Sequence, residues 1–237
     1  MKYILLLIFW VLFSFSVHSA VSAPLIEYHM HMSPAADGAK RVALTFDACM
    51  GKVDTRIVDA LVQNKIKATI FVSGRWLKYN KKSIEILKAN SDLFEIENHG
   101  AQHVTALDEQ RNVYGLKSAG SADAVSAEVE DGAASVLTNF GYWPKWYRGA
   151  GAIYTNSSME LIKDLDFRLA GFSISGDGGA TWTAAHSAKA VAGAKDGDVI
   201  IAHINQPVKP AGAGVVEGIL KLKADGFNFV KLDEAFY

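Results

Sequence analysis

The chain carries at residues 42–47 the stretch Val42-Ala43-Leu44-Thr45-Phe46-Asp47, in which five residues that favour a buried strand end abruptly in a carboxylate. Six further short apolar runs follow it, and longer patterns with helical periodicity lie between them. The seven predicted strands are residues 42–46, 68–72, 94–97, 146–148, 168–172, 199–202 and 229–231. The predicted helices are residues 55–64, 83–89, 122–139, 157–164, 187–194 and 215–224.

Short strands that alternate with helices indicate a parallel sheet whose strands are joined by right-handed crossovers. Several of these strands are apolar on both faces. The solution is then either an open doubly wound sheet or a closed or nearly closed barrel. No repeat or Pro/Ser-rich linker interrupts residues 41–237, so one domain accounts for them.

The composition excludes several classes of protein. The 237 residues include 24 Lys+Arg and 25 Asp+Glu, for a formal net charge of -1, and half of them are hydrophobic. This balance predicts a globular domain with a substantial core and no nucleic-acid partner. The single cysteine, Cys49, cannot form an internal disulfide, so stability must come from packing.

The N-terminal residues resemble a secretory signal. Lys2 precedes an apolar run of 14 residues at 4–17, and small residues suited to a peptidase follow at 21–23. A membrane-spanning helix needs about 17–25 residues, so no stable membrane anchor is expected. We therefore predict a signal peptide at residues 1–23, an N-terminal extension at 24–40, and a secreted or periplasmic protein.

Ionisable side chains follow the predicted strands at the points where those strands end. Six such residues are Asp47, His99, His103, Arg148, Asp177 and His203. Because the carboxyl ends of parallel strands share one face of an α/β fold, we expect all six on a single rim. The residues themselves suggest roles there.

His99 and His103 are four residues apart at a predicted helix start, a spacing that suits two imidazoles on one divalent metal. The alternative is a helix cap and a surface histidine. Asp47 is a candidate general base, and otherwise a cap. His203 is a candidate proton donor, and otherwise a satisfied core histidine, while Arg148 would orient Asp47 and keep it ionised.

Five motifs, taken in order, resemble the polysaccharide deacetylase family. They are the strand-T-F-D motif, the H-x-x-x-H motif, the arginine turn, the aspartate-to-tryptophan segment and the strand-end histidine. This family includes chitin and peptidoglycan deacetylases, and the resemblance covers roughly residues 41–232. It implies a distorted (β/α)7 barrel and metal-assisted hydrolysis of an N-acyl group on a sugar. It also implies specific roles: Asp47 as general base, His99 and His103 as metal ligands, Arg148 as the arginine that orders the base, His203 as general acid, and Gly151 as the donor of an oxyanion N–H.

Three departures from the family pattern leave parts of the site open. Ala48 stands where the family has a second, metal-binding aspartate, so the third ligand of zinc or a similar divalent metal could be Asp47, Asp54, Cys49 or water. The acid-tuning aspartate is replaced either by Ser175 or by Asp177 on a longer loop. Trp182 forms the hydrophobic wall of the substrate site only if that loop is longer.

The predicted function is therefore hydrolysis of a carbon–nitrogen bond in an N-acylated glycan or a related molecule. Two alternatives are a catalytically silent carbohydrate-binding relative, favoured by Ala48, and a metal-independent hydrolase of a cyclic amide. A further hypothesis makes Cys49 a nucleophile. The sequence contains no indication of the oligomeric state.

Overall fold

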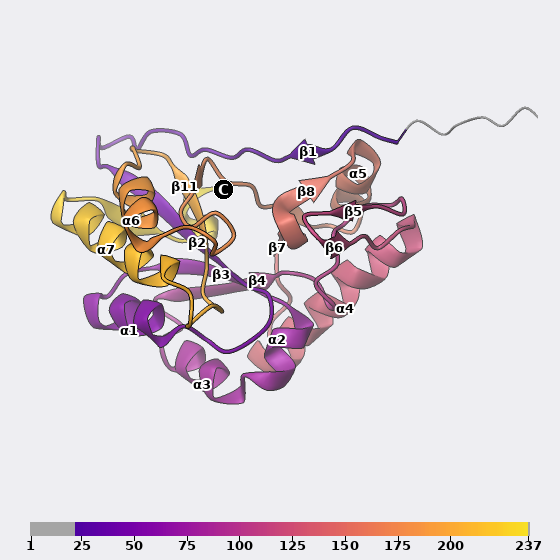
Figure 1. Cartoon of the computed structure of the whole chain (residues 1–237), viewed down its shortest axis with the longest axis horizontal. Helices are drawn as coiled ribbons and strands as arrows, with labels where there is room; N and C mark the ends of the chain where they lie inside the picture. Colours follow the sequence, from indigo (N-terminus) through magenta and orange to yellow (C-terminus); the bar gives the residue numbers. More distant parts are fainter. Residues whose placement is uncertain (1–21, 237) are drawn as a thin grey trace, which may run out of the picture.

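The computed structural model describes residues 22–236, which fold around one curled parallel sheet (Figure 1). Seven strands form it in the spatial order β10-β11-β2-β3-β4-β7-β9. Their bounds are β2 Arg41–Ala48, β3 Ala68–Val72, β4 Phe94–Asn98, β7 Trp146–Tyr147, β9 Arg168–Leu169, β10 Ile174–Ser175 and β11 Val199–His203. This arrangement is a distorted (β/α)7 barrel, and the predicted fold class is confirmed.

The remaining strands are short. β12 (Asn228–Val230) pairs in parallel with residues 41–43 of β2, so it flanks the first half of β2, whereas β3 flanks the second half. β1 (Ile26–Glu27) pairs with β8 (Ile153–Tyr154), and β5 (Asn112–Val113) pairs with β6 (Leu116–Lys117), both antiparallel. Among the predicted strands, the one at residues 229–231 therefore lies outside the seven-strand order, and the unpredicted β10 takes an edge position.

Helices cover the outside of the sheet. They are α1 Thr55–Asn64, α2 Gly74–Tyr79, α3 Lys81–Ala89, α4 Ala122–Phe140, α5 Asn156–Asp164, α6 Ala184–Ala192, α7 Ala211–Ala224 and α8 Leu232–Ala235. All six predicted helices are present, with ends shifted by at most four residues. Within residues 22–236, no helix has the length and apolar character needed to cross a membrane.

The alternation of side chains along β2 decides which groups face the inside of the barrel. Leu44 and Phe46 pack into the large core between the sheet and the helices, whereas Ala43 packs into a smaller core inside the curl. Asp47 follows the same alternation inward, at the carboxyl end of the strand. In the parallel register it lies opposite His203 of β11, which places the two predicted catalytic groups side by side.

The N-terminal extension completes the open edge of the barrel. Residues 24–40 run along one side of the molecule, opposite helices α1 to α3 (Figure 1). Between the edge strands β9 and β10, Phe172 donates its N–H to Tyr28 and accepts one from Met30, at 3.3 and 3.2 Å. A Cβ on Gly171 would lie only 2.0 Å from the Tyr28 carbonyl oxygen, so this close approach requires glycine. The predicted signal peptide, apart from its last two residues, lies outside the described residues.

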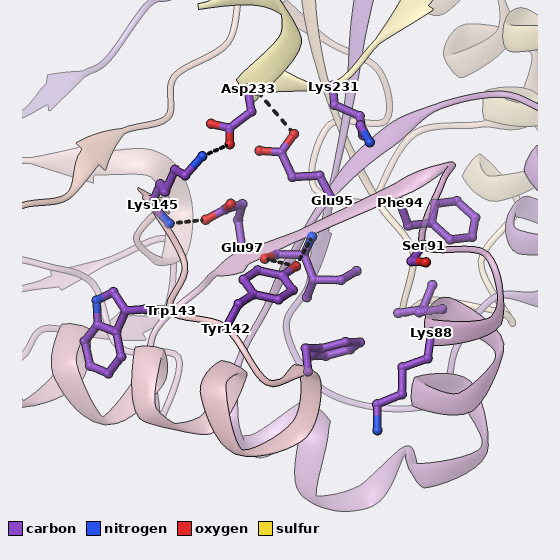
Figure 2. Close-up of a pocket in the computed structure, with 13 residues that line it drawn as sticks. Lys88, Ser91, Phe94, Glu95, Glu97, Tyr142, Trp143, Lys145, Lys231 and Asp233 are labelled. Carbon is purple, nitrogen blue, oxygen red and sulfur yellow. Dashed lines mark hydrogen bonds and ion pairs between the residues drawn. The ribbon is translucent and has the colours of Figure 1, made fainter. Parts of the chain in front are cut away.

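A buried carboxyl group bridges a split in the sheet. β4 and β7 pair at a single position, Asn98 with Tyr147, and diverge below it. In the gap, Glu97 accepts the backbone N–H group of Lys145 at 2.9 Å (Figure 2) and that of Trp146 at 2.7 Å. Burial raises the pKa of Glu97 to about 9, so its carboxyl group is protonated at neutral pH.

This raised pKa predicts a pH-dependent stability. In the unfolded chain Glu97 loses its proton near pH 4.5, so between pH 4.5 and about 9 the folded state binds more protons, and stability falls as the pH rises. The wild type and a Glu97→Gln variant have the same titratable neighbours around this position, Glu95, Asp233, Lys145 and Tyr142, so the difference between the two proteins reports on Glu97. Glu97→Gln keeps a hydrogen-bond acceptor but cannot titrate, so it does not lose stability in this way. The unfolding free energy of the variant minus that of the wild type should therefore increase by up to about 1.4 kcal/mol per pH unit between pH 5 and 8.

Urea unfolding of the two proteins at each pH measures this difference, with the exposed Glu85→Gln variant as control. A difference between Glu97→Gln and wild type that stays constant with pH would contradict the assignment of the proton to Glu97.

Candidate active site

A cavity of about 600 Å³ opens at the carboxyl ends of the strands. Eight residues singled out from the sequence line it: Asp47, Cys49, His99, His103, Gly151, Ser175, Asp177 and His203. Arg148 lies beneath them with no exposed surface. The expectation that these groups share one rim is therefore met by the geometry, and their individual environments show what each can do.

Cys49, His99 and His103 form a group that can hold a metal ion. Their ligand atoms all lie within 4.8 Å of one another, and the Sγ atom of Cys49 is 3.4 Å from Nε2 of His99. Among the described residues this is the only group of three or more His, Cys, Asp or Glu side chains so arranged. One sulfur and two nitrogen donors suit zinc better than a hard ion such as magnesium.

Both histidines are prepared for such a role. His99 donates its Nδ1–H to the carbonyl oxygen of Arg148 at 2.6 Å, so Nε2 is the ring nitrogen that faces Cys49. His103 has a buried Nδ1 atom with no hydrogen-bond partner among the described residues. An unsatisfied buried nitrogen beside a thiol and a second imidazole fits a metal ligand.

Of the other ligands considered for this site, Asp54 is committed elsewhere. Its carboxylate caps α1 by accepting the N–H of Arg56 and also pairs with the Arg56 guanidinium at 2.8 Å. Asp47 lies nearer, with its Oδ2 atom 3.8 Å from Nε2 of His99. Ala48 packs into the core between sheet and helices, away from the histidines.

The two histidines are not on a helix, and the predicted helix start at this point is wrong. They lie on a loop after β4 in which Gly100 and His103 both have left-handed backbones, with φ of 80° and 62°. Glu128 of α4 holds the loop by accepting the N–H groups of Gln102, His103 and Val104, at 2.8 to 3.2 Å. The loop therefore depends on a carboxylate from a distant helix.

Sequence reasoning missed Glu128, although one signal was present. It lies on the buried face of α4 together with Val125, Val129 and Gly132. A glutamate at an apolar position of an amphipathic helix indicates a buried partner for its charge.

Arg148 binds the carboxylate of Asp47, a contact expected from the sequence. Its Nη1 atom donates to Asp47 at 3.0 Å and to Thr45 at 2.9 Å, and Nη2 donates to the carbonyl oxygen of Gly171 at 2.8 Å. Burial raises the pKa of Asp47, but the charges of His99 and Arg148 outweigh it, so the net pKa lies below its ordinary value. Asp47 is therefore an ionised acceptor.

Asp177 is the carboxylate that lies beside His203. Both Asp177 oxygens lie 3.1 Å from Nδ1 of His203, and one also accepts the His203 backbone N–H at 2.7 Å. Ser175 instead accepts the N–H of Gly178. Burial lowers the pKa of His203, but Asp177 and Cys49 outweigh it and raise the pKa well above its usual value.

The cysteine is polarised by the same groups. Burial raises the pKa of the Cys49 thiol, but the facing histidines outweigh it, and the net pKa lies well below its usual value. Burial lowers the pKa of His99, but Asp47 and Cys49 raise it to about 9. The thiolate, which is the metal-binding form of cysteine, is therefore favoured more than in an ordinary cysteine.

Two expected substrate contacts have different positions. Gly151 lines the cavity in a left-handed turn with φ of 75°. Trp182 does not line the cavity: its ring stacks on His186 at 4.0 Å and fills the space under Gly178. The apolar wall consists instead of Tyr114, Leu116 and Phe172, and Glu27 of the N-terminal extension lies at its margin.

Comparison with known proteins agrees with this geometry. The chain is 25% identical over 208 residues to the peptidoglycan-N-acetylglucosamine deacetylase PgdA of Listeria monocytogenes; the match covers 86% of this chain but only 40% of PgdA. Among solved structures, the peptidoglycan deacetylase PdaC of Bacillus subtilis superposes with a TM-score of 0.67 at 22% identity, over 85% of this chain and 92% of PdaC.

A second solved structure differs in its activity. BA3943 of Bacillus anthracis, described as a CE4 family pseudoenzyme, superposes with a TM-score of 0.65 at 18% identity, over 86% of this chain and 69% of its own. The polysaccharide deacetylase family model matches residues 35–170, more than half of the chain. Sequence match, fold and site geometry agree, and the chain belongs to the polysaccharide deacetylase family.

Proposed function

We propose that this protein hydrolyses the acyl–nitrogen bond of an N-acetylated sugar unit in a glycan. The observation that carries the proposal is the pair of Asp47 and His203 in one cavity beside the Cys49, His99 and His103 group. Each member of the pair is held by its own partner, Arg148 or Asp177. The activity named for PgdA, deacetylation of peptidoglycan N-acetylglucosamine, supports this choice of bond.

The metal-capable group fits a divalent ion of the zinc type. A metal held by Cys49, His99 and His103 would act as a Lewis acid on the acyl oxygen of the substrate. Because Cys49 replaces the oxygen ligand expected at position 48, we propose that zinc is preferred over harder ions.

The side chains divide the proton transfers between them. Asp47, kept ionised by Arg148, accepts the proton of the attacking water at its carboxylate. The backbone N–H of Gly151 donates to the acyl oxygen as negative charge develops on it. His203, with its Nδ1 beside Asp177, donates a proton from Nε2 to the departing sugar nitrogen, so the products are a carboxylate and an amine.

A catalytically silent relative is the second candidate. Ala48 stands where the family has a metal-binding aspartate, and a pseudoenzyme shares the fold. The two candidates differ in turnover, since both would bind glycan. We further propose, from the pattern at residues 1–23, that the protein is exported to where such glycans lie.

Asp47→Asn separates the two candidates. The variant keeps the hydrogen bond with Arg148 but cannot accept the water proton, so acetate release from N-acetylglucosamine oligomers should fall at least about a hundredfold. The exposed Asp59→Asn on α1 is the matched control and should retain full activity. Absence of acetate release from the wild type, or full activity of Asp47→Asn, would overturn the proposed mechanism.

Tyr114 provides a test of the substrate wall. Its ring is 77% exposed at the tip of the β5–β6 hairpin and lines the cavity, so it can stack on a sugar ring. Tyr114→Asn tolerates the left-handed backbone there, with φ of 53°, and should raise KM for oligomers roughly three- to tenfold. Tyr114→Phe keeps the ring and should match the wild type. A loss in kcat at constant KM would argue against stacking.

A further inference from the structure

A second cavity, of about 500 Å³, lies along β4 (Figure 2), whereas the active-site cavity lies beyond the carboxyl ends of the strands. It fills the wedge where β4 and β7 diverge below their single paired position. Its lining residues come from β4, from α3 and the turn after it, from the segment that follows α4, and from the C-terminal end. The described mechanism uses none of them.

Carboxyl groups form one side of this cavity. Glu95 and Glu97 are 9% and 2% exposed, and Asp233 lies beside them. One oxygen of Glu95 accepts from Thr69 at 3.1 Å and from the N–H of Asp233 at 3.2 Å. Its other oxygen, Oε1, is buried and has no hydrogen-bond partner among the described residues. A buried acceptor without a partner is costly, so this oxygen would gain from a donor that enters the cavity.

The positive charges at the margin already have partners. Lys145 pairs with Asp233, Lys231 lies 3.7 Å from Glu234, and Lys88 lies 3.5 Å from Glu85. The unsatisfied polarity of the cavity is therefore that of an acceptor, and it favours a ligand that donates hydrogen bonds or carries positive charge.

Aromatic rings form another side of the cavity. Trp143 is 49% exposed and Tyr142 is 41% exposed; in Figure 2 Tyr142 lies next to Glu97, and Trp143 lies farther from the carboxyl groups. Tyr142 is fixed because its hydroxyl both donates to and accepts from the backbone of Ile96, at 3.0 Å each way. Exposed aromatic faces next to acceptors are suited to a sugar ring or to an organic cation.

A metal ion fits this site poorly. Within the described part of the chain, the Glu95, Glu97 and Asp233 oxygens do not form a group close enough to share an ion, unlike those at Cys49, His99 and His103. A cavity of this size instead holds a ligand of one or two sugar units.

We propose that this cavity binds an amino sugar, with its ammonium group on Glu95 and Glu97 and its ring face on Trp143. The choice of an amino sugar rests on the proposed function, because deacetylation leaves a free amine on the glycan. The prediction that the site binds a cation rests only on the carboxyl groups that line the cavity. The proton that Glu97 holds at neutral pH in the empty cavity is released to buffer when the ammonium group binds.

Titration calorimetry with glucosamine and N-acetylglucosamine tests the proposal on the full chain carrying Asp47→Asn, which silences the proposed active site. Glucosamine should bind at least tenfold more tightly than its neutral acetylated counterpart. The apparent enthalpy at pH 7.5 should change between buffers of different ionisation enthalpy, because a proton is released.

Glu95→Gln and Glu97→Gln should each weaken glucosamine binding at least tenfold, and Trp143→Ala, at a half-exposed site, should do so without endangering the fold. Circular dichroism checks that each variant is folded. Equal affinity for the two sugars, or binding unaffected by all three substitutions, would overturn the proposal. Cyclohexylammonium that binds as tightly as glucosamine would overturn the assignment to a sugar.

These readouts do not depend on turnover. If the wild type releases no acetate while glucosamine binding follows the expected pattern, the proposed function fails and the second site stands. If acetate is released and glucosamine does not bind, the proposed function stands and the second site fails.

Discussion

The buried guanidinium of Arg148 joins the catalytic end of the barrel to its open edge. It donates to Asp47 on β2 and to carbonyl oxygens at residues 170 and 171 beyond β9, and it lies 4.4 Å from the ring centre of Phe71. Its own carbonyl accepts from His99. Removal of one partner of such a buried pair costs about 3–5 kcal/mol, because the other charge is left uncompensated. The position of the base, the orientation of one metal-capable histidine and the closure near β9 therefore depend on one residue.

The single cysteine occupies the position on which the chemistry depends most. Ala48 faces the outer core, and the next residue, Cys49, faces the two histidines. The family pattern has a carboxylate at position 48, and here a sulfur follows one residue later. A thiolate carries the same charge as an aspartate but is softer, which moves the preference of the site toward zinc. Under the proposed function, the absence of the second aspartate would be a change of ligand and not the loss of a metal site.

The sequence predicted the long elements well, because strands such as β3 and helices such as α1 have clear periodicity and caps. It failed where long-range contacts override local pattern. β10 has only two residues, and the predicted strand 168–172 ends after Leu169 because Gly171 and Phe172 bond to Arg148 and the N-terminal extension. The loop of His103 is shaped by Glu128 of α4, and Trp182 is held by His186, neither of which short-range spacing reveals.

The central claim is that Cys49 is the third protein ligand of a metal held by His99 and His103. Absorption spectroscopy of the cobalt-substituted protein tests it most directly, because a thiolate bound to cobalt gives an ultraviolet charge-transfer band that nitrogen and oxygen ligands do not. We expect this band in the wild type and its loss in Cys49→Ser, while visible cobalt bands persist. Cobalt bound by the wild type without the charge-transfer band, or with a band that survives in Cys49→Ser, would contradict the account.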